Sequence, residues 1–187
     1  MDFCDALLQY TPRDAQETAD RAVMLDCLNR FSDVYERSNL LCHVTASAWI
    51  TNAARDRVLM IYHNIYDSWA WTGGHADGET DLLSVALREA HEETGISCAV
   101  PVRGSIFSLE ILTVDGHEKR GHYVPSHLHL NLTYLLKADE TEALQKKEDE
   151  NSGAAWFDLE EAIAASAEPW FRTRIYSKLN EKLKLYR

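Results

Sequence analysis

The sequence has no long hydrophobic segment. No apolar run approaches the roughly 20 residues needed to span a bilayer. The first residues, MDFCDALLQY, have no basic segment ahead of an apolar run. Neither a transmembrane helix nor an export signal is therefore expected. We predict a protein that has no membrane partner and is located in the cytoplasm.

Basic residues are scarce relative to acidic ones. The chain has 19 lysines and arginines against 30 aspartates and glutamates, which gives a formal net charge of −11. This charge opposes binding to a nucleic-acid polymer or an anionic membrane, since both require positive potential. A small anionic substrate is compatible with it if a bound cation reverses the field locally.

Cysteine, proline and glycine are also infrequent in the 187 residues. The four cysteines are scattered without C-x-x-C spacing, so we expect reduced packing residues in a reducing cytosol. No Pro- or Gly-rich linker, low-complexity tract or internal repeat divides the chain. Together with an ordinary globular composition, these absences predict a single α/β domain.

The most informative stretch is a glycine-rich turn followed by a helix, GGHADGETDLLSVALREAHEETGI, over residues 73–96. Thr80 is expected to cap the N-terminus of the helix, and Gly95 to adopt the left-handed conformation at its C-terminus. The helix should therefore run from about residue 81 to 94. Leucines and alanines recur at helical spacing and should form one apolar arc.

Three glutamates crowd a neighbouring face of this helix. Glu89, Glu92 and Glu93 lie at positions i, i+3 and i+4, where like charges repel one another, and they oppose the helix dipole. Such conflicts are expected at functional sites, where a divalent cation would convert repulsion into coordination. The alternative is a solvated acidic surface on which Arg88 pairs with Glu92.

The stretch resembles the box of the Nudix hydrolase family. That box reads Gly, five residues, Glu, seven residues, Arg-Glu, an aliphatic residue, any residue, Glu-Glu, any residue, Gly and an aliphatic residue. The matching positions are Gly74, Arg88, Glu89, Glu92, Glu93, Gly95 and Ile96. Two positions differ, since Thr80 replaces the first Glu and Ala90 replaces a larger aliphatic residue. Glu79 lies one residue earlier, and a remodelled turn would let it serve instead.

The resemblance implies a fold, a reaction and a cofactor. The fold would be an α/β/α sandwich with a mixed sheet. The substrate would be a small-molecule phosphoanhydride, a nucleoside diphosphate linked to another moiety, cleaved at its diphosphate. Mg²⁺, with Mn²⁺ as a substitute, would be bound by Glu89, Glu92 and Glu93, and a carbonyl of Gly73 or Gly74 would complete the shell. Mg²⁺ prefers oxygen ligands and lowers the pKa of an attacking water.

The resemblance also implies roles for two further residues. Arg88 would hold a box glutamate through a charge-assisted pair. Glu150 precedes a late strand, at a position similar to that of a loop acid in many family members, and is the candidate general base. The alternative function is a catalytically silent Nudix-fold domain that binds a nucleotide as a sensor or regulator. The change at Thr80 favours that alternative, whereas the retained glutamates and arginine oppose it.

A helical extension is expected before the Nudix domain. Apolar spacing and a Thr11-Pro12 start predict a helix from residue 11 to about 37. This helix lies in an extension of residues 1–38, and residues 39–187 would form the domain. We expect the helix to pack on the domain; a lid or a contact in a homodimer is the alternative.

Several segments have the composition of strands. Residues 40–51 and 57–64 predict a hairpin, and further strands are expected at 97–102, 105–114 and 154–157. The intervening segment of residues 115–125 is predicted to be a polar loop. His43, in the first strand, is expected on the surface.

Residues 127–136 alternate polar and apolar side chains without error. One face should belong to the core and the other, which includes His127 and His129, should face solvent or substrate. The two histidines would also suit a metal such as Zn²⁺ or Ni²⁺, but His-x-His without a third ligand is weak support for such a site.

Helices are expected near the C-terminus. Residues 140–147 predict a short helix, and residues 159–165 a second one with a capping box formed by Asp158 and Glu161. A final helix should begin at Pro169.

Overall fold

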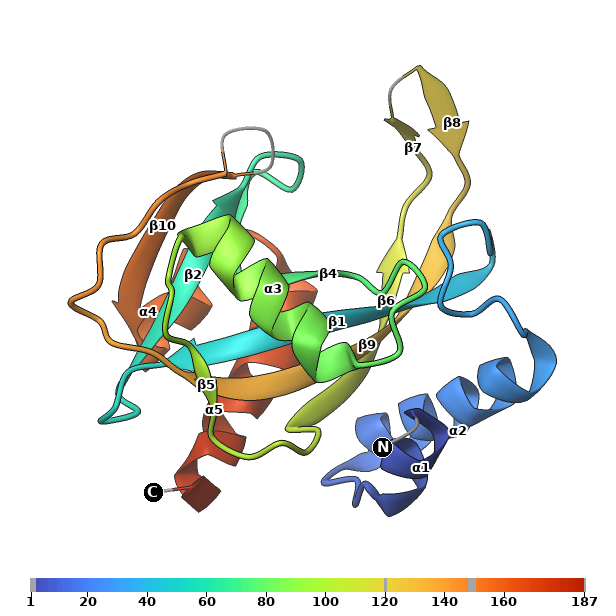
Figure 1. The fold of residues 1–187 in the computed structure, drawn as a ribbon, viewed down its shortest axis with the longest axis horizontal. Coiled ribbons are helices and arrows are strands. Elements are labelled where there is room, and N and C mark those ends of the chain that lie inside the picture. Colours follow the sequence, from blue (N-terminus) through green and yellow to red (C-terminus); the bar gives the residue numbers. More distant parts are fainter. Residues whose placement is uncertain (1–2, 120, 148–150, 187) are drawn as a thin grey trace.

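The computed structural model describes residues 3–119, 121–147 and 151–186 (Figure 1). The helices are α1 (Phe3–Gln9), α2 (Ala15–Arg30), α3 (Leu82–Thr94), α4 (Leu159–Ala165), the π-helix η1 (Phe171–Tyr176), α5 (Ser177–Leu183) and the short 3-10 helix η2 (Lys184–Tyr186). Figure 1 shows α3 crossing one side of a central sheet, with α4 and α5 on the other. Within these ranges, no helix is long and apolar enough to cross a membrane.

The central sheet is mixed, as predicted. Its strands are β1 (Cys42–Thr51), β2 (Arg57–His63), β3 (Ser68–Ala70), β4 (Thr72–His75), β5 (Val100–Pro101), β6 (Ser108–Val114), β9 (His127–Lys137) and β10 (Asn151–Asp158). The order is β10-β2-β1-β9-β5, with β3 on β2, β4 on β1 and β6 on β9. The β1–β9 pair is parallel and the other pairs of described strands are antiparallel.

Strand β1 is the centre of the fold, and all ten of its residues are buried. Alternate residues such as Val44, Ala46 and Ile50 pack in one core with the apolar face of α3. Trp49 points to the opposite core, where it stacks on Tyr176 with ring centroids 5.3 Å apart. Helices on both faces of the sheet therefore explain why this strand is buried along its whole length.

Helix α3 begins with a different cap from the predicted one. The N-cap is Asp81, not Thr80: its Oδ1 accepts a hydrogen bond from the Ser84 amide at 3.2 Å, and its Oδ2 accepts one from the Ser84 hydroxyl at 2.9 Å. Threonine and aspartate are both common N-cap residues, and the geometry of the preceding turn places Asp81 rather than Thr80 at the cap. The predicted end is confirmed, because Gly95 adopts φ +75 and its N–H donates to the carbonyl of His91.

The N-terminal region contains two helices instead of one. Helix α1 was not predicted. Helix α2 starts after Asp14, whose Oδ1 accepts a hydrogen bond from the Glu17 amide at 2.8 Å, so the predicted start at Thr11-Pro12 is wrong. It ends at Arg30 rather than near residue 37.

These helices pack on the sheet, as expected. Phe3, Leu7 and Met24 are buried in the same core as β1. In Figure 1 both helices lie beside one edge of the sheet.

Two predictions near the C-terminus are wrong. Residues 140–147 form no helix, because the amide and hydroxyl of Thr141 both donate to Asp139 Oδ1 and hold a turn. Helix α4 has the predicted bounds, but the Asp158 side chain makes no capping hydrogen bond. Its carboxylate lies 3.5 Å from Arg57 Nε instead.

Three other segments differ from the prediction in detail. The strand expected at 97–102 is reduced to β5. The loop expected at 115–125 contains a hairpin of β7 (His117–Lys119) and β8 (His122–Val124), which projects from the sheet in Figure 1. The final helix includes the wide turns of η1 before it continues as α5.

A buried set of charges joins α2 to β6 and α5. Lys182 forms an ion pair with Glu17, while Lys178 Nζ lies 3.6 Å from Glu17 Oε1 and 2.9 Å from Glu110 Oε1. Neither glutamate is accessible to solvent. Burial alone would raise the pKa of Glu17, but the two lysines hold that pKa below its usual value. The position of α2 therefore depends on cations supplied by α5.

Replacing Glu17 should reveal this dependence. Glu17→Gln is expected to lower the free energy of unfolding by about 3 kcal/mol, because Lys182 would stay buried without its anion. Denaturant unfolding followed by circular dichroism measures the loss. Asp26→Asn is the matched control on the same helix, since its pair with Arg30 is exposed and should contribute little. Equal effects of the two substitutions would contradict the proposed importance of the buried charges.

Candidate active site

Strand β4 and helix α3 meet through a buried carboxylate. The amide of Gly73 donates a hydrogen bond to Glu93 Oε2 at 2.9 Å. Glu93 is only 3% exposed although it is charged. Its backbone carbonyl accepts a hydrogen bond from Asn151 Nδ2 at 2.9 Å, which attaches the start of β10 to the same turn of α3.

A second carboxylate lies against the next glycine. A Cβ atom placed on Gly74 would lie 2.5 Å from the carboxyl carbon of Glu89, so a side chain here would displace that carboxylate. Burial raises the pKa of Glu89, and nearby Glu92 adds to the effect while Arg88 opposes it. The Glu89 carboxylate is therefore held in a place that disfavours its charge and would be relieved by a cation.

The third box glutamate is more exposed and is bound by two cations. Glu92 Oε2 lies 3.1 Å from Lys147 Nζ, and Glu92 Oε1 lies 3.8 Å from Arg88 Nε. Arg88 also donates to Glu89 Oε1 at 3.2 Å. Lys147 was not identified from the sequence, because it lies in a charged segment with no motif.

Glu79 lies at the start of the helix rather than beside Arg88. Its Oε1 accepts a hydrogen bond from the Asp81 amide at 2.9 Å. Among the described residues, the ion pairs of Arg88 are with Glu89 and Glu92. The geometry gives Glu79 a place in the turn before α3. Glu150, the candidate general base, lies outside the described residues, immediately before Asn151.

The donors at this junction fit a hard divalent cation. Carboxylates of Glu89 and Glu93 lie at the adjacent glycines 74 and 73, and all the available donors are oxygens, which Mg²⁺ prefers. In the described part of the chain, however, Glu89, Glu92 and Glu93 are not arranged as a group that could hold one metal ion. To bind the same ion as Glu89 and Glu93, Glu92 must break its surface ion pairs. Such pairs contribute little free energy, so breaking them costs little.

The polar side of β9, which was predicted to face solvent or substrate, is largely buried and therefore not solvated. Asn131 and Thr133 are inaccessible. Asn131 Oδ1 accepts hydrogen bonds from Thr45 at 3.0 Å and Ser47 at 2.8 Å, and its Nδ2 donates to Glu110 Oε2 at 3.2 Å. The parallel pairing of β1 and β9 places these polar rows side by side, so their groups satisfy one another.

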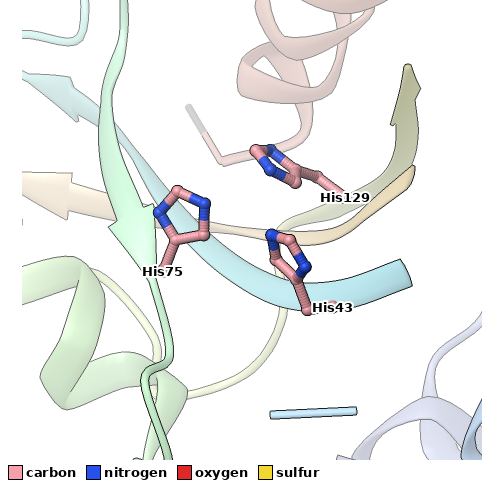
Figure 2. Close-up of side chains that lie close together, drawn as sticks. All are labelled: His43, His75 and His129. Atoms are coloured by element: carbon pink, nitrogen blue, oxygen red, sulfur yellow. The ribbon is translucent and has the colours of Figure 1, made fainter. Parts of the chain in front are cut away.

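Histidines from three strands gather at one end of this polar face (Figure 2). One ring nitrogen each of His43, His75 and His129 lies within 4.8 Å of the others. His43 is 4% exposed, so its expected surface position is wrong. Burial lowers its pKa, and burial with the neighbouring histidines lowers the pKa of His129 to about 2. Of these three, only His129 was considered as a metal ligand from the sequence, since the cluster depends on strand pairings between distant residues.

The chain is similar to known proteins both in sequence, through a family model, and in structure. A family model described as the NUDIX domain matches residues 42–179. No curated protein matches the sequence. A NUDIX-family hydrolase from Clostridium perfringens is 19% identical with a TM-score of 0.53, covering 78% of this chain and 98% of that one.

Two further solved structures are similar. The Nudix hydrolase RenU from M. smegmatis is 16% identical with a TM-score of 0.55, covering 78% of this chain and 88% of that one. The dihydroneopterin triphosphate pyrophosphohydrolase of E. coli is 17% identical with a TM-score of 0.52, covering 78% and 96%. At these identities, the structures establish a common fold.

The close approach of Gly74 to Glu89 gives a direct test of the junction. Gly74→Ala should lower stability by about 1–3 kcal/mol, because the added methyl group must push the Glu89 carboxylate and its helix away from β4. Thermal and denaturant unfolding measure the change. Gly104→Ala is the matched control, since nothing lies within 4 Å of a Cβ atom there. A variant at position 74 as stable as that control would show that the contact is not tight.

Proposed function

Because the chain belongs to the NUDIX domain family and is a pyrophosphohydrolase of that family, we propose that its substrate is a nucleoside diphosphate linked to another moiety. We further propose that Mg²⁺, or Mn²⁺ in its place, is bound by Glu89, Glu92 and Glu93 together with a backbone carbonyl of Gly74. Water would attack one phosphorus of the diphosphate and yield two phosphate monoesters.

The observation that carries this proposal is the placement of two carboxylates at consecutive glycines. Glu89 lies against Gly74, and Glu93 accepts the amide hydrogen of Gly73. Both carboxylates are shielded from solvent, with side-chain exposure of 13% for Glu89 and residue exposure of 3% for Glu93. Two shielded carboxylates beside one backbone segment favour binding of a metal ion, because a cation would offset the cost of burying them.

Each residue contributes a separate function. Mg²⁺ at this place would neutralise the diphosphate and lower the pKa of the attacking water. Arg88 contacts Glu89 and Glu92 and so positions both. The bond from Gly73 to Glu93 fixes the turn from which a Gly74 carbonyl would reach the ion. Lys147 balances Glu92 and lies where a substrate phosphate would compete for its charge.

The general base is proposed to be Glu150. The residue that follows it, Asn151, binds the carbonyl of Glu93, so the chain passes next to the metal-binding turn at this point. Glu79 is a positioning residue in this proposal, because its carboxylate accepts the Asp81 amide at the start of α3. The Thr80 difference from the family box leaves the three helix glutamates in place.

A hard divalent cation should be required for turnover. Purified protein is treated with EDTA and mixed with a panel of nucleoside diphosphate compounds, and the monoester products are separated and quantified by ion-exchange chromatography. We expect no hydrolysis until Mg²⁺ or Mn²⁺ is restored, because the oxygen donors match hard cations. Full turnover with negligible residual metal would exclude the proposed role of the glutamates.

Glu92→Gln should separate the effect of losing a metal ligand from any effect on folding. Glu92 has 41% side-chain exposure, so the substitution should leave stability nearly unchanged. It should reduce kcat/KM by about tenfold or more and weaken Mg²⁺ binding, since a charged ligand is lost. Glu160→Gln, a charge-matched change on the exposed side of α4, is the control. Kinetics equal to those of the control would remove Glu92 from the site.

A further inference from the structure

We propose that His43, His75 and His129 form a second metal site, which binds a borderline divalent transition metal ion and prefers Zn²⁺. This site differs from the glutamate site in its donors and in its position. The inference does not rest on the proposed hydrolysis, because metal binding is its readout.

Strand pairing brings the three histidines together. His43 of β1 is paired with His129 of β9 across the parallel ladder. His75 of β4 is paired with Thr45, which lies two residues after His43 and so on the same face of β1. The ring centroids are 4.8–5.0 Å apart in all three pairs. Figure 2 shows the three rings converging from their separate strands.

His43 presents a buried nitrogen that needs a partner. Its Nδ1 lies 3.0 Å from the carbonyl oxygen of Asn39, and because a carbonyl only accepts, Nδ1 must carry the hydrogen. Nε2 is then the acceptor, and this atom is buried without a hydrogen-bond partner. Such an atom needs an explanation in a folded protein, and a bound metal ion supplies one.

The backbone behind His43 is held firmly. The Asn39 side chain donates to Asp33 Oδ1 at 2.9 Å and accepts from the amide of Cys42 at 3.2 Å. A metal-binding histidine usually donates its other ring hydrogen to a carbonyl or carboxylate, which fixes its tautomer and orientation. The carbonyl of Asn39 accepts the Nδ1 hydrogen of His43 in the same way.

His129 is also supported from outside the cluster. Its Nε2 lies 3.2 Å from Nε2 of His127, and His127 Nδ1 donates to the carbonyl of Pro125 at 2.8 Å. His127 is 8% exposed, so this supporting pair is shielded from water. His127 is therefore a positioning residue for the cluster.

Three imidazoles select the class of ion. Nitrogen donors suit Zn²⁺, Ni²⁺, Co²⁺ and Cu²⁺, whereas Mg²⁺ prefers oxygen. Three histidines and one open position are typical of catalytic zinc sites. Zn–N bonds of roughly 2.0–2.1 Å place tetrahedral ligands about 3.4 Å apart. Small side-chain rotations from the observed separations would close the rings around one ion.

The two sites lie on opposite faces of β4. A Cβ atom on Gly74 would point at Glu89 of α3, and because successive residues of a strand alternate, the His75 side chain points to the other face. The ions would therefore differ in ligands and in immediate surroundings. Occupation of one site can be measured while the other is disabled.

Titration with zinc tests the proposal on the full chain. EDTA-stripped protein is titrated with Zn²⁺ against a chromogenic chelator, in an excess of Mg²⁺ that blocks the oxygen site. We expect one equivalent of Zn²⁺ per chain, retained in Glu92→Gln. No binding, or loss of zinc in Glu92→Gln, would overturn the proposal.

Histidine variants identify the ligands. His75→Ala should weaken zinc binding by more than about 100-fold, and His127→Ala by about 10–100-fold, the usual effect of losing a supporting group. His122→Ala, on the exposed hairpin strand β8, is the control and should bind zinc normally. Normal binding by His75→Ala, with a circular dichroism spectrum like that of the unaltered protein, would refute the assignment.

X-ray absorption at the zinc edge does not depend on the folding of a variant. The unaltered protein loaded with one equivalent of Zn²⁺ should show the outer-shell scattering of several imidazole rings. A shell of oxygen donors without imidazole would assign the ion to the glutamates and overturn the proposal.

Discussion

The proposed active site depends on the close approach of the β4 backbone to the carboxylates of α3. Gly73 supplies an amide hydrogen to Glu93, and Gly74 leaves the space that Glu89 occupies. Because both glutamates are shielded from water, their charges must be compensated by hydrogen bonds, by Arg88 or by a bound cation. The same approach fixes α3 on the sheet. The Gly73-Gly74 dipeptide therefore determines both how α3 packs on the sheet and where its carboxylates lie.

Local features of the structure could be predicted from the sequence, whereas long-range pairings could not. The end of α3 followed from Gly95, and the strand 127–136 followed from strict alternation. The N-cap was misassigned because Thr80 and Asp81 are both suitable caps, and only the turn geometry distinguishes them. The polar side of β9 was expected to face solvent or substrate because nothing in its own sequence reveals a polar partner strand.

The same distinction between local and long-range features applies to the candidate sites. The glutamates were identified by their spacing on one helix, which is a local property. His43 and His75 were not, because their proximity to His129 arises from one parallel and one antiparallel pairing between strands that are separated in the sequence. The resulting sheet offers oxygen donors on one side of β4 and nitrogen donors on the other. A single edge strand can thus separate two kinds of coordination chemistry by the alternation of its residues.

The buried contact between Glu17 and Lys182 has a consequence for the order of folding during synthesis. Glu17 leaves the ribosome before the lysines that compensate it, which lie 161 and 165 residues later in the chain. Until α5 emerges, burial of Glu17 would leave a carboxylate without its cations, which is strongly unfavourable. Helix α2 should consequently remain undocked while the sheet is being made. Helix α2, although synthesised before the sheet, would be among the last elements to reach its final position.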